Sequence, residues 1–189
     1  MTEKEVLGLF EKSGALLKGH FKLSSGLHSE KYLQCALVLQ YPDIAERLSK
    51  ALANKFSAEK IDAVIGPALG GVTLAYEAAR AIGARGLFTE RQDGKMVLRR
   101  GFSMSKGEKV LVVEDVVTTG DSTKEVIDLV KSFGADIVGV GSIIDRTSVK
   151  IDFGAPFKPL AKVEVETFKE KDCLLCKKNI PVTKPGSRR

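Results

Sequence analysis

Residues 110–123, VLVVEDVVTTGDST, predict a strand, a tight turn and the start of a helix in direct succession. The apolar run 110–113 is typical of a buried strand, and apolar residues at helical spacing resume at Val126. The acids Glu114 and Asp115 follow this run, ahead of the turn. The segment therefore has the strand–turn–helix order from which α/β proteins are built.

The turn at residues 118–122 consists of small and hydroxyl-bearing residues, with a glycine at its centre. At a helix N-terminus such a turn presents backbone N–H groups and hydroxyls to an anion, and the helix dipole favours the charge of a phosphate. The carboxylates of Glu114 and Asp115 suit ribose hydroxyls, held directly or through a divalent cation. The alternative is an ordinary joint with an N-cap Ser or Asp. The acid pair, the hydroxyl-rich turn and the flanking strand together favour a phosphate site over an ordinary joint.

The rest of the chain alternates strand patterns with helical patterns. Thr2 and Glu5 form a capping-box pattern that opens an N-terminal helix ending near Gly14, and residues 15–40 are less regular. Further strands are expected at residues 61–65, 84–89, 137–144 and 160–165, and further helices at residues 44–56, at 72–82 and from the turn to residue 134. This alternation predicts a largely parallel twisted sheet flanked by helices, with ligands beyond the carboxyl ends of its strands.

The net charge of +6 is concentrated at one end of the chain. The last thirteen residues hold five basic residues and no acid, so the other 176 residues sum to about +1. Aromatic residues are few and do not alternate with the basic ones, which disfavours nucleic-acid binding. No apolar run is long enough to span a bilayer, and the acidic N-terminal segment does not resemble a secretory signal, so we expect a cytoplasmic protein.

The segment at residues 110–123 resembles the binding signature for phosphoribosyl pyrophosphate (PRPP) in the type I phosphoribosyltransferases. The resemblance implies that fold, and it implies that the two acids contact the ribose hydroxyls while the turn surrounds the 5′-phosphate. It also places Asp115 and Thr118 at the reacting carbon, with Asp115 as a catalytic residue. The residues implied to bind PRPP here are Glu114, Asp115, Val117, Thr118, Thr119, Gly120, Asp121 and Ser122.

A second glycine-rich turn, IGPALGG, occupies residues 65–71. Glycines at both ends of a strand-to-helix turn allow the backbone to approach an anion, although they also suit a tight turn with no ligand. The family resemblance makes this the pyrophosphate loop, formed by Ala68, Leu69 and Gly70, with a cis peptide between Ala68 and Leu69. Orotate enzymes often have a lysine in this loop. Gly70 replaces it here, so backbone amides are expected to bind more of the pyrophosphate.

The sequence patterns that indicate the acceptor base are less specific than those of residues 110–123. Residues 21–33, FKLSSGLHSEKYL, resemble the hood of the orotate phosphoribosyltransferases, which implies that Ser24 and Tyr32 bind orotate together with Thr118. Arg146 follows an apolar strand, and its planar guanidinium suits a carboxylate, although a surface salt bridge would use the same residue. The resemblance makes Arg146 an orotate-binding residue.

Residues 90–100, ERQDGKMVLRR, predict a projecting hairpin around an Asp-Gly turn. A solvated charged hairpin is one interpretation, and a flap that neutralises the leaving pyrophosphate is the other. The Lys-x-His-Gly motif of the commoner orotate enzymes is absent. We assign its role in catalysis and PRPP binding to Lys95, supported by Arg91, whereas Arg99 and Arg100 could be structural. In the resembled enzymes this loop completes the neighbouring subunit's site, which implies a homodimer.

The sequence therefore predicts a single phosphoribosyltransferase domain over residues 1–189. It comprises a hood at about 1–40, a PRPP-binding core at about 41–165 and a tail at 166–189. The resemblance implies transfer of the phosphoribosyl group of PRPP to orotate, giving orotidine 5′-phosphate and pyrophosphate. It also implies Mg²⁺ that arrives with PRPP and has no direct protein ligand. A phosphoribosyltransferase for another base, and a PRPP-sensing regulator, are the alternatives.

The three cysteines include one Cys-x-x-Cys pair, Cys173 and Cys176. A structural zinc would need two further ligands from Cys35, His20 and His28, all of them far away in the sequence. A single pair is weak support for a metal. Structural or incidental use, metal sharing across a dimer and redox chemistry all stay open.

Overall fold

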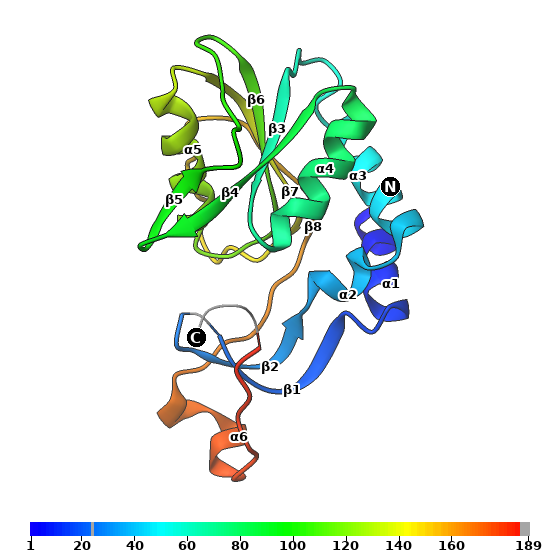
Figure 1. The fold of residues 1–189 in the computed structure, drawn as a ribbon. Helices are drawn as coiled ribbons and strands as arrows, with labels where there is room; N and C mark the ends of the chain where they lie inside the picture. The colour runs from blue at the N-terminus through cyan, green and yellow to red at the C-terminus, as the bar shows by residue number, and fades with distance from the viewer. Residues whose placement is uncertain (24, 186–189) are drawn as a thin grey trace.

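The computed structural model describes residues 1–23 and 25–185. Its centre is a six-stranded sheet of order β5-β4-β3-β6-β7-β8, in which every neighbouring pair is parallel except β4 and β5 (Figure 1). The strands are β3 (Ala63–Pro67), β4 (Arg85–Gln92), β5 (Lys95–Leu98), β6 (Lys109–Val117), β7 (Asp136–Asp145) and β8 (Phe157–Lys162). The predicted α/β fold with a largely parallel sheet is confirmed.

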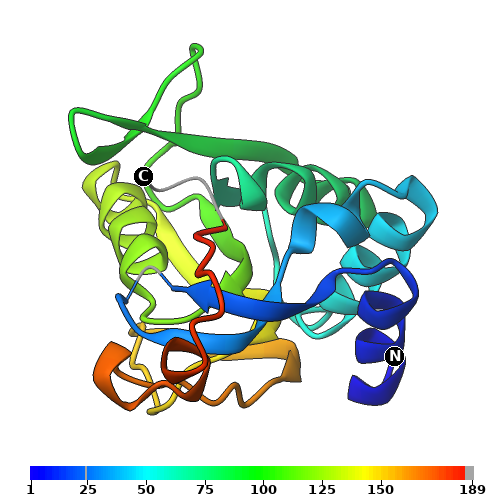
Figure 2. The ribbon, with the colours of Figure 1, turned by 90° about the horizontal axis from the view of Figure 1, so that it is seen from below.

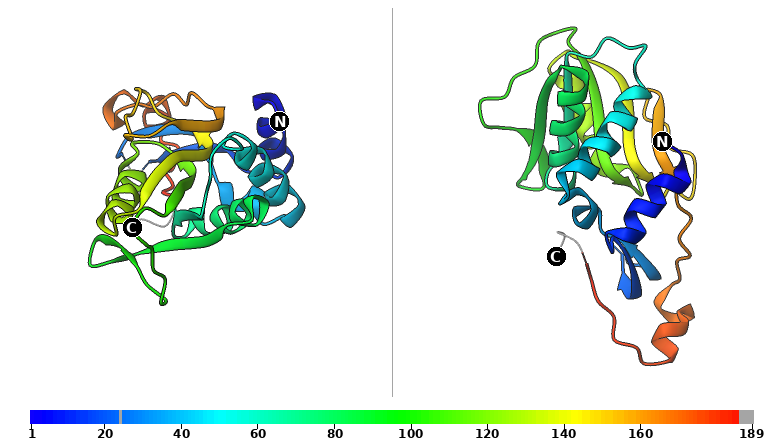
Figure 3. Two further views of the ribbon diagram at one scale, coloured as in Figure 1. Left: turned by 90° about the horizontal axis from the view of Figure 1, so that it is seen from above. Right: turned by 90° about the vertical axis from the view of Figure 1, so that its right-hand side faces the viewer.

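Helices cover both faces of this sheet (Figure 3, left). They are α1 (Glu3–Lys12), α2 (Cys35–Leu39), α3 (Pro42–Asn54), α4 (Gly70–Ile82) and α5 (Asp121–Ser132). Alternate residues of β6 point to opposite faces of the sheet. Leu111 and Val113 pack with residues of α1 to α4, whereas Val110 and Val112 pack with residues of α5. This period of two, with apolar residues on both faces, explains the unbroken apolar run in the sequence.

A smaller layer lies beside the edge at which β3 ends and α4 begins (Figure 1). It contains the antiparallel pair β1 (Leu16–Lys22) and β2 (His28–Leu33). The tail carries a short 3₁₀ helix, η1 (Glu170–Asp172), and α6 (Leu174–Lys177). Seen from this side, β1 and β2 cross in front of the six-stranded sheet, and the tail crosses them (Figure 2). The predicted hood therefore lies over the carboxyl ends of the parallel strands.

Several predicted boundaries were wrong by two to four residues. The strand at 61–65 is β3, and the strand at 160–165 is β8, which begins at Phe157. β6 continues through the acids to Val117, because Glu114 and Val117 pair with Ser142 and Asp145 of β7. Helix α2 was not predicted, since five residues are too few to show a helical period.

The capping box at Thr2 and Glu5 is present. In the part of the chain that the structure describes, no helix is long and apolar enough to cross a membrane.

Candidate active site

The acids of the β6 motif lie at the end of a central strand. Glu114 is buried, with 8% of its surface exposed, and Asp115 is half-buried. The Val116 N–H donates to Oδ1 of Asp115 at 2.8 Å. Burial raises the pKa of the Asp115 carboxyl, against the effect of hydrogen bonds from its neighbours. The carboxylate is therefore oriented and partly desolvated before any substrate binds.

The turn after β6 has the conformation that its sequence requires. Gly120 adopts φ +78°, and a Cβ atom there would meet the side chains of Ile151 and Phe153 at 2.9–3.1 Å. Thr118 and Thr119 are exposed, and the Thr119 hydroxyl donates to Oδ2 of Asp121 at 2.9 Å.

Helix α5 begins at Asp121, directly after Gly120, which has no side chain to accept from the first amides. The N-terminus of this helix is a favourable place for a phosphate, because the helix dipole and the first N–H groups favour a negative charge. Ser122 stands in the first turn of the same helix and is half-buried, and Val117 is buried at the end of β6.

The β3–α4 turn contains the predicted cis peptide, between Ala68 and Leu69. The Ala68 N–H donates to the Thr89 carbonyl at 2.8 Å, while the Leu69 side chain is 76% exposed. Gly70 begins α4 against the acid pair, because a Cβ atom on it would lie 2.5 Å from Oδ2 of Asp115. The two turns predicted to bind the pyrophosphate and the 5′-phosphate are therefore neighbours.

The residues predicted to bind the base converge on the same acids. Tyr32 on β2 and Arg146 after β7 are both half-buried, and each lies within electrostatic range of the other. Burial raises the pKa of Tyr32, and the charge of Asp115 adds to the effect. Burial lowers the pKa of Arg146, whose buried Nε has no hydrogen-bond partner. The Arg146 guanidinium thus keeps a donor that no described protein group uses. Ser24 lies outside the described residues.

Cys35 belongs to this site although sequence reasoning considered it only as a metal ligand. It begins α2, is 2% exposed, and its thiol is close enough to the Asp115 carboxylate to hydrogen-bond. Burial raises the pKa of the thiol well above its usual range, and the charges of Asp115 and Glu114 raise it further. Only the packing of α2 against β6 reveals this neighbour, since no local pattern marks it.

The predicted hairpin is formed by β4 and β5. Asp93 and Gly94 have φ values of +50° and +80°, and Gln92 pairs with Lys95 across this turn. Lys95 is exposed beside the tip. Arg91 contacts Glu125 of α5, with Nη2 3.0 Å from Oε1, and also donates to the Gly94 carbonyl.

The other two cations of the hairpin pair with one acid. Glu90 lies 2.6 Å from Nε of Arg100 and 3.7 Å from Nη1 of Arg99. Within residues 1–23 and 25–185, the Lys95 ammonium has no ion pair. Lys95 is therefore the hairpin cation that is available to a ligand.

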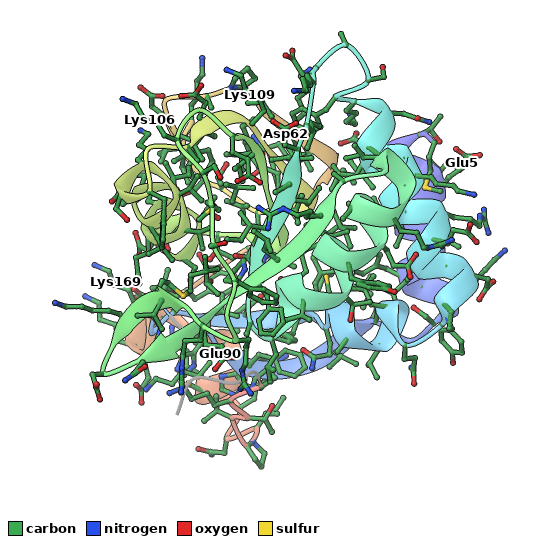
Figure 4. The ribbon with its side chains drawn as sticks, turned by 45° about the horizontal axis from the view of Figure 1, so that its top comes forward. Glu5, Asp62, Glu90, Lys106, Lys109 and Lys169 are labelled. Atoms are coloured by element: carbon green, nitrogen blue, oxygen red, sulfur yellow. The ribbon has the colours of Figure 1, made fainter. Side chains whose placement is uncertain are left out.

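A separate hollow of about 470 Å³ lies at the opposite edge of the sheet, where the parallel strands begin (the amino edge). It is lined by Asp62, Arg85, Lys106 and Glu108 among others. Figure 4 shows Asp62 and Lys106 far from Glu90 of the hairpin. Asp62 lies 3.2 Å from Lys60, and Arg85 pairs with Glu108. Asp62, Arg85 and Glu108 thus have charged partners within the protein, so the hollow at the amino edge is not the candidate site.

The chain is similar to known proteins. The family model described as "Phosphoribosyl transferase domain" matches residues 37–170. The orotate phosphoribosyltransferase of Caldanaerobacter subterraneus is 58% identical over 189 residues, all of both chains. That of Thermotoga maritima is 53% identical over 185 residues, 98% of this chain and 97% of the other. The crystal structure of the Aeropyrum pernix orotate phosphoribosyltransferase superposes with a TM-score of 0.71 at 25% identity, covering 84% of this chain and 93% of that one.

Proposed function

This chain belongs to the phosphoribosyltransferase family, as an orotate phosphoribosyltransferase, and we propose that it works at the carboxyl edge of the six-stranded sheet. A ring N–H of orotate gives up its proton and the nitrogen forms a bond to C1 of the ribose, as the bond from C1 to the pyrophosphate oxygen breaks and the released proton is taken up by the pyrophosphate or by water. Orotidine 5′-phosphate and pyrophosphate leave. The observation that carries this proposal is the contact between Gly70 and Asp115, which joins the two phosphate turns into one site.

The donor half of the site consists of the two strand-end turns. Residues 118–122 surround the 5′-phosphate with hydroxyls and the first amides of α5. Glu114 and Asp115 hold the ribose hydroxyls beside the reacting carbon. The backbone of residues 68–70 binds the pyrophosphate, because no lysine is present in that turn.

The acceptor half uses Arg146 and Tyr32. A half-buried guanidinium with an unused donor matches the carboxylate that distinguishes orotate from uracil. The Tyr32 ring bounds the same space from the hood. The base is therefore selected by a charge-assisted contact and placed opposite Asp115.

Little covalent chemistry is required of the protein. As the bond to pyrophosphate breaks, C1 develops positive charge and the leaving group gains negative charge. The carboxylates of Glu114 and Asp115 stabilise the positive charge at C1, and the hairpin brings Lys95 to the negative charge on the pyrophosphate. Arg91 anchors the hairpin to α5 through Glu125, so it positions Lys95 and reaches the pyrophosphate only when that pair opens.

We also propose that PRPP binds with Mg²⁺. In the described part of the chain, the candidate site offers the two acids Glu114 and Asp115, and no group of three or more potential ligands. That donor set fits an ion that keeps waters and takes most of its oxygens from PRPP. When bound, Mg²⁺ neutralises phosphate charge. We expect the enzyme to act in the cytoplasm, where its relatives' biosynthetic reaction would draw on dissolved metabolites.

A homodimer is the third element of the proposal. Leu69 just before α4 and Tyr76 within it are 76% and 65% exposed. Tyr76 borders an apolar hollow of about 360 Å³ that Val72, Phe88 and Phe102 also line. Exposed apolar surface of this kind favours a protein partner. We propose that a second copy packs on this face and that its hairpin reaches the site of the first copy.

The experiment is a panel of bases. Purified protein with PRPP and Mg²⁺ should consume orotate, measured by the loss of its absorbance, and leave uracil and guanine unchanged. Turnover of another base without loss of orotate would contradict the assignment of Arg146 and Tyr32.

A further inference from the structure

Four potential metal ligands from opposite ends of the chain meet between the hood and the tail. They are His20 on β1, His28 on β2, and Cys173 and Cys176 at the start of α6. Their ligand atoms all lie within 4.8 Å of one another. His20, His28 and Cys173 are 4%, 2% and 1% exposed. The separation in sequence that made a zinc site difficult to predict is therefore removed by the fold.

The spacing of these atoms suits a tetrahedral ion. Zinc bonds of about 2.3 Å to sulfur and about 2.0 Å to nitrogen imply S···N edges of about 3.6 Å and an N···N edge of about 3.3 Å. Nε2 of His20 lies 3.5 Å from Sγ of Cys173 and 3.6 Å from Sγ of Cys176. Nδ1 of His28 lies 3.2 Å from Sγ of Cys176. The two nitrogens are 2.8 Å apart, as a direct hydrogen bond between the rings would place them.

The outer contacts orient the ligands. Nδ1 of His20 lies 2.7 Å from the Ile180 carbonyl, which can only accept, so Nδ1 carries the proton. The lone pair of His20 is then on Nε2 and points into the cluster. A carbonyl that fixes the tautomer of a metal-binding histidine is the usual second contact of zinc sites. In His28, the buried Nε2 has no hydrogen-bond partner, so this ring depends on what its Nδ1 binds.

The tail needs such an anchor. In residues 166–185 only Cys173 is buried, and α6 is four residues long, too short to be stable by itself. The tail meets the hood through polar contacts, which include two isolated bridges, Phe21 with Thr183 and His28 with Phe168, and the hydrogen bond of His20 with the Ile180 carbonyl. Figure 3, right, shows that the tail with α6 extends beyond β1 and β2, away from the six-stranded sheet. Hydrophobic packing therefore does not account for the position of the tail.

A redox role for the cysteine pair fits less well. A disulfide-exchanging thiol must be reached by its partner, whereas Cys173 is almost wholly buried. Two buried imidazoles, one in contact with both sulfurs and the other with Cys176, are in contrast what zinc requires. We propose that His20, His28, Cys173 and Cys176 bind one structural Zn²⁺, which fastens the tail to the hood beside the strand that carries Tyr32.

The test is the metal content of the full-length protein. After gel filtration in metal-free buffer, the wild type should retain about one Zn²⁺ per chain, measured by inductively coupled plasma mass spectrometry. Substituted with Co²⁺, it should show the strong visible bands of a tetrahedral ion and a charge-transfer band from thiolate. A folded wild type that holds no zinc when zinc is supplied, or that contains a Cys173–Cys176 disulfide, would overturn the proposal.

Variants locate the metal. Cys176→Ser and His28→Gln should each lower zinc content at least tenfold, whereas Cys35→Ala, which removes the one buried thiol outside the cluster, should keep about one zinc. Zinc loss should also make the tail sensitive to protease while the core stays folded. If Cys176→Ser does not accumulate, the cobalt spectrum of the wild type still decides, because an octahedral spectrum without thiolate bands excludes this ligand set.

Discussion

A Cβ atom built on Gly70 would lie 2.5 Å from Oδ2 of Asp115. The start of α4 and the end of β6 are therefore in contact through a position that only glycine can occupy without moving the carboxylate. Asp115 is held in place on its other side by the Val116 N–H. A lysine at residue 70, as in many orotate enzymes, would displace the Asp115 carboxylate. The position of this acid therefore depends on the glycine, and with no lysine in the turn the backbone amides are left to bind the pyrophosphate.

Gly70→Ala should lower kcat/KM for PRPP about 10–100-fold, because the added methyl group turns the Asp115 carboxylate away from the ribose. Circular dichroism should show an unchanged fold. The matched control is Gly8→Ala in α1, where a Cβ atom meets nothing within 4 Å. That variant should keep full activity and gain up to about 1 kcal/mol of stability. Equal activity of both variants would show that the contact at residue 70 is unimportant.

Asp115→Asn should stabilise the protein and inactivate it. Burial raises the pKa of Asp115 above its ordinary 3.8, so the folded state holds that proton more tightly than the unfolded chain does. The resulting stability is present below pH 3.8 and is lost as the pH rises through the raised pKa. At neutral pH the variant should therefore melt about 2–4 °C higher than the wild type.

The gain in melting temperature should shrink as the pH falls toward 3.8, which melting curves over a pH series would measure. Asn keeps an oxygen for the Val116 N–H, so the fold is preserved. Turnover should fall about 10²-fold, since the charge beside C1 is lost. A variant that melts below the wild type at neutral pH would refute the desolvation argument.

Lys95→Ala should lower kcat about 10²–10³-fold and change PRPP binding much less, because the lysine acts on charge that develops as pyrophosphate leaves. Steady-state kinetics with calorimetric binding of PRPP separate the two effects. Arg99→Ala is the control, since that exposed cation already pairs with Glu90. Unchanged turnover in Lys95→Ala would place the chemistry of the hairpin on another residue.

Arg146→Lys should raise KM for orotate about 10–100-fold and leave KM for PRPP within about twofold, because lysine keeps the charge and loses the planar pair of donors. Arg146→Ala should bind orotate more weakly still. Initial rates at varied orotate and varied PRPP measure both constants. Equal effects on the two substrates would mean that Arg146 supports the fold of the site and does not select the base.

Mixing two inactive variants tests whether the hairpin completes the site of a second copy. Asp115→Asn has an intact hairpin, and Lys95→Ala has intact strand-end turns. If subunits exchange in a homodimer, an equal mixture should recover about a quarter of wild-type activity, since half the dimers then contain one complete site. Native mass spectrometry would verify the exchange. No recovery despite exchange would show that each chain uses its own hairpin.

The local structure of residues 110–122 and of the hairpin could be predicted because its signals are local. A strand, two acids and a turn of small residues are adjacent in the chain, and Gly120 and the Asp93–Gly94 turn adopt the positive φ values that their residue types favour. The largest errors, at α2 and at the ends of β6 and β8, occur where the partner strand or the packing decides the boundary.

The sequence by itself determined the α/β alternation, the two glycine-containing turns and the hairpin, since each depends on residues within a few positions of one another. Only the tertiary structure decided that Cys35 faces Asp115, that Arg91 pairs with Glu125, and that the two histidines of the hood meet the cysteines of the tail. These contacts join segments separated by tens of residues or more. Their geometry follows from how helices and strands pack, for which a local pattern carries no signal.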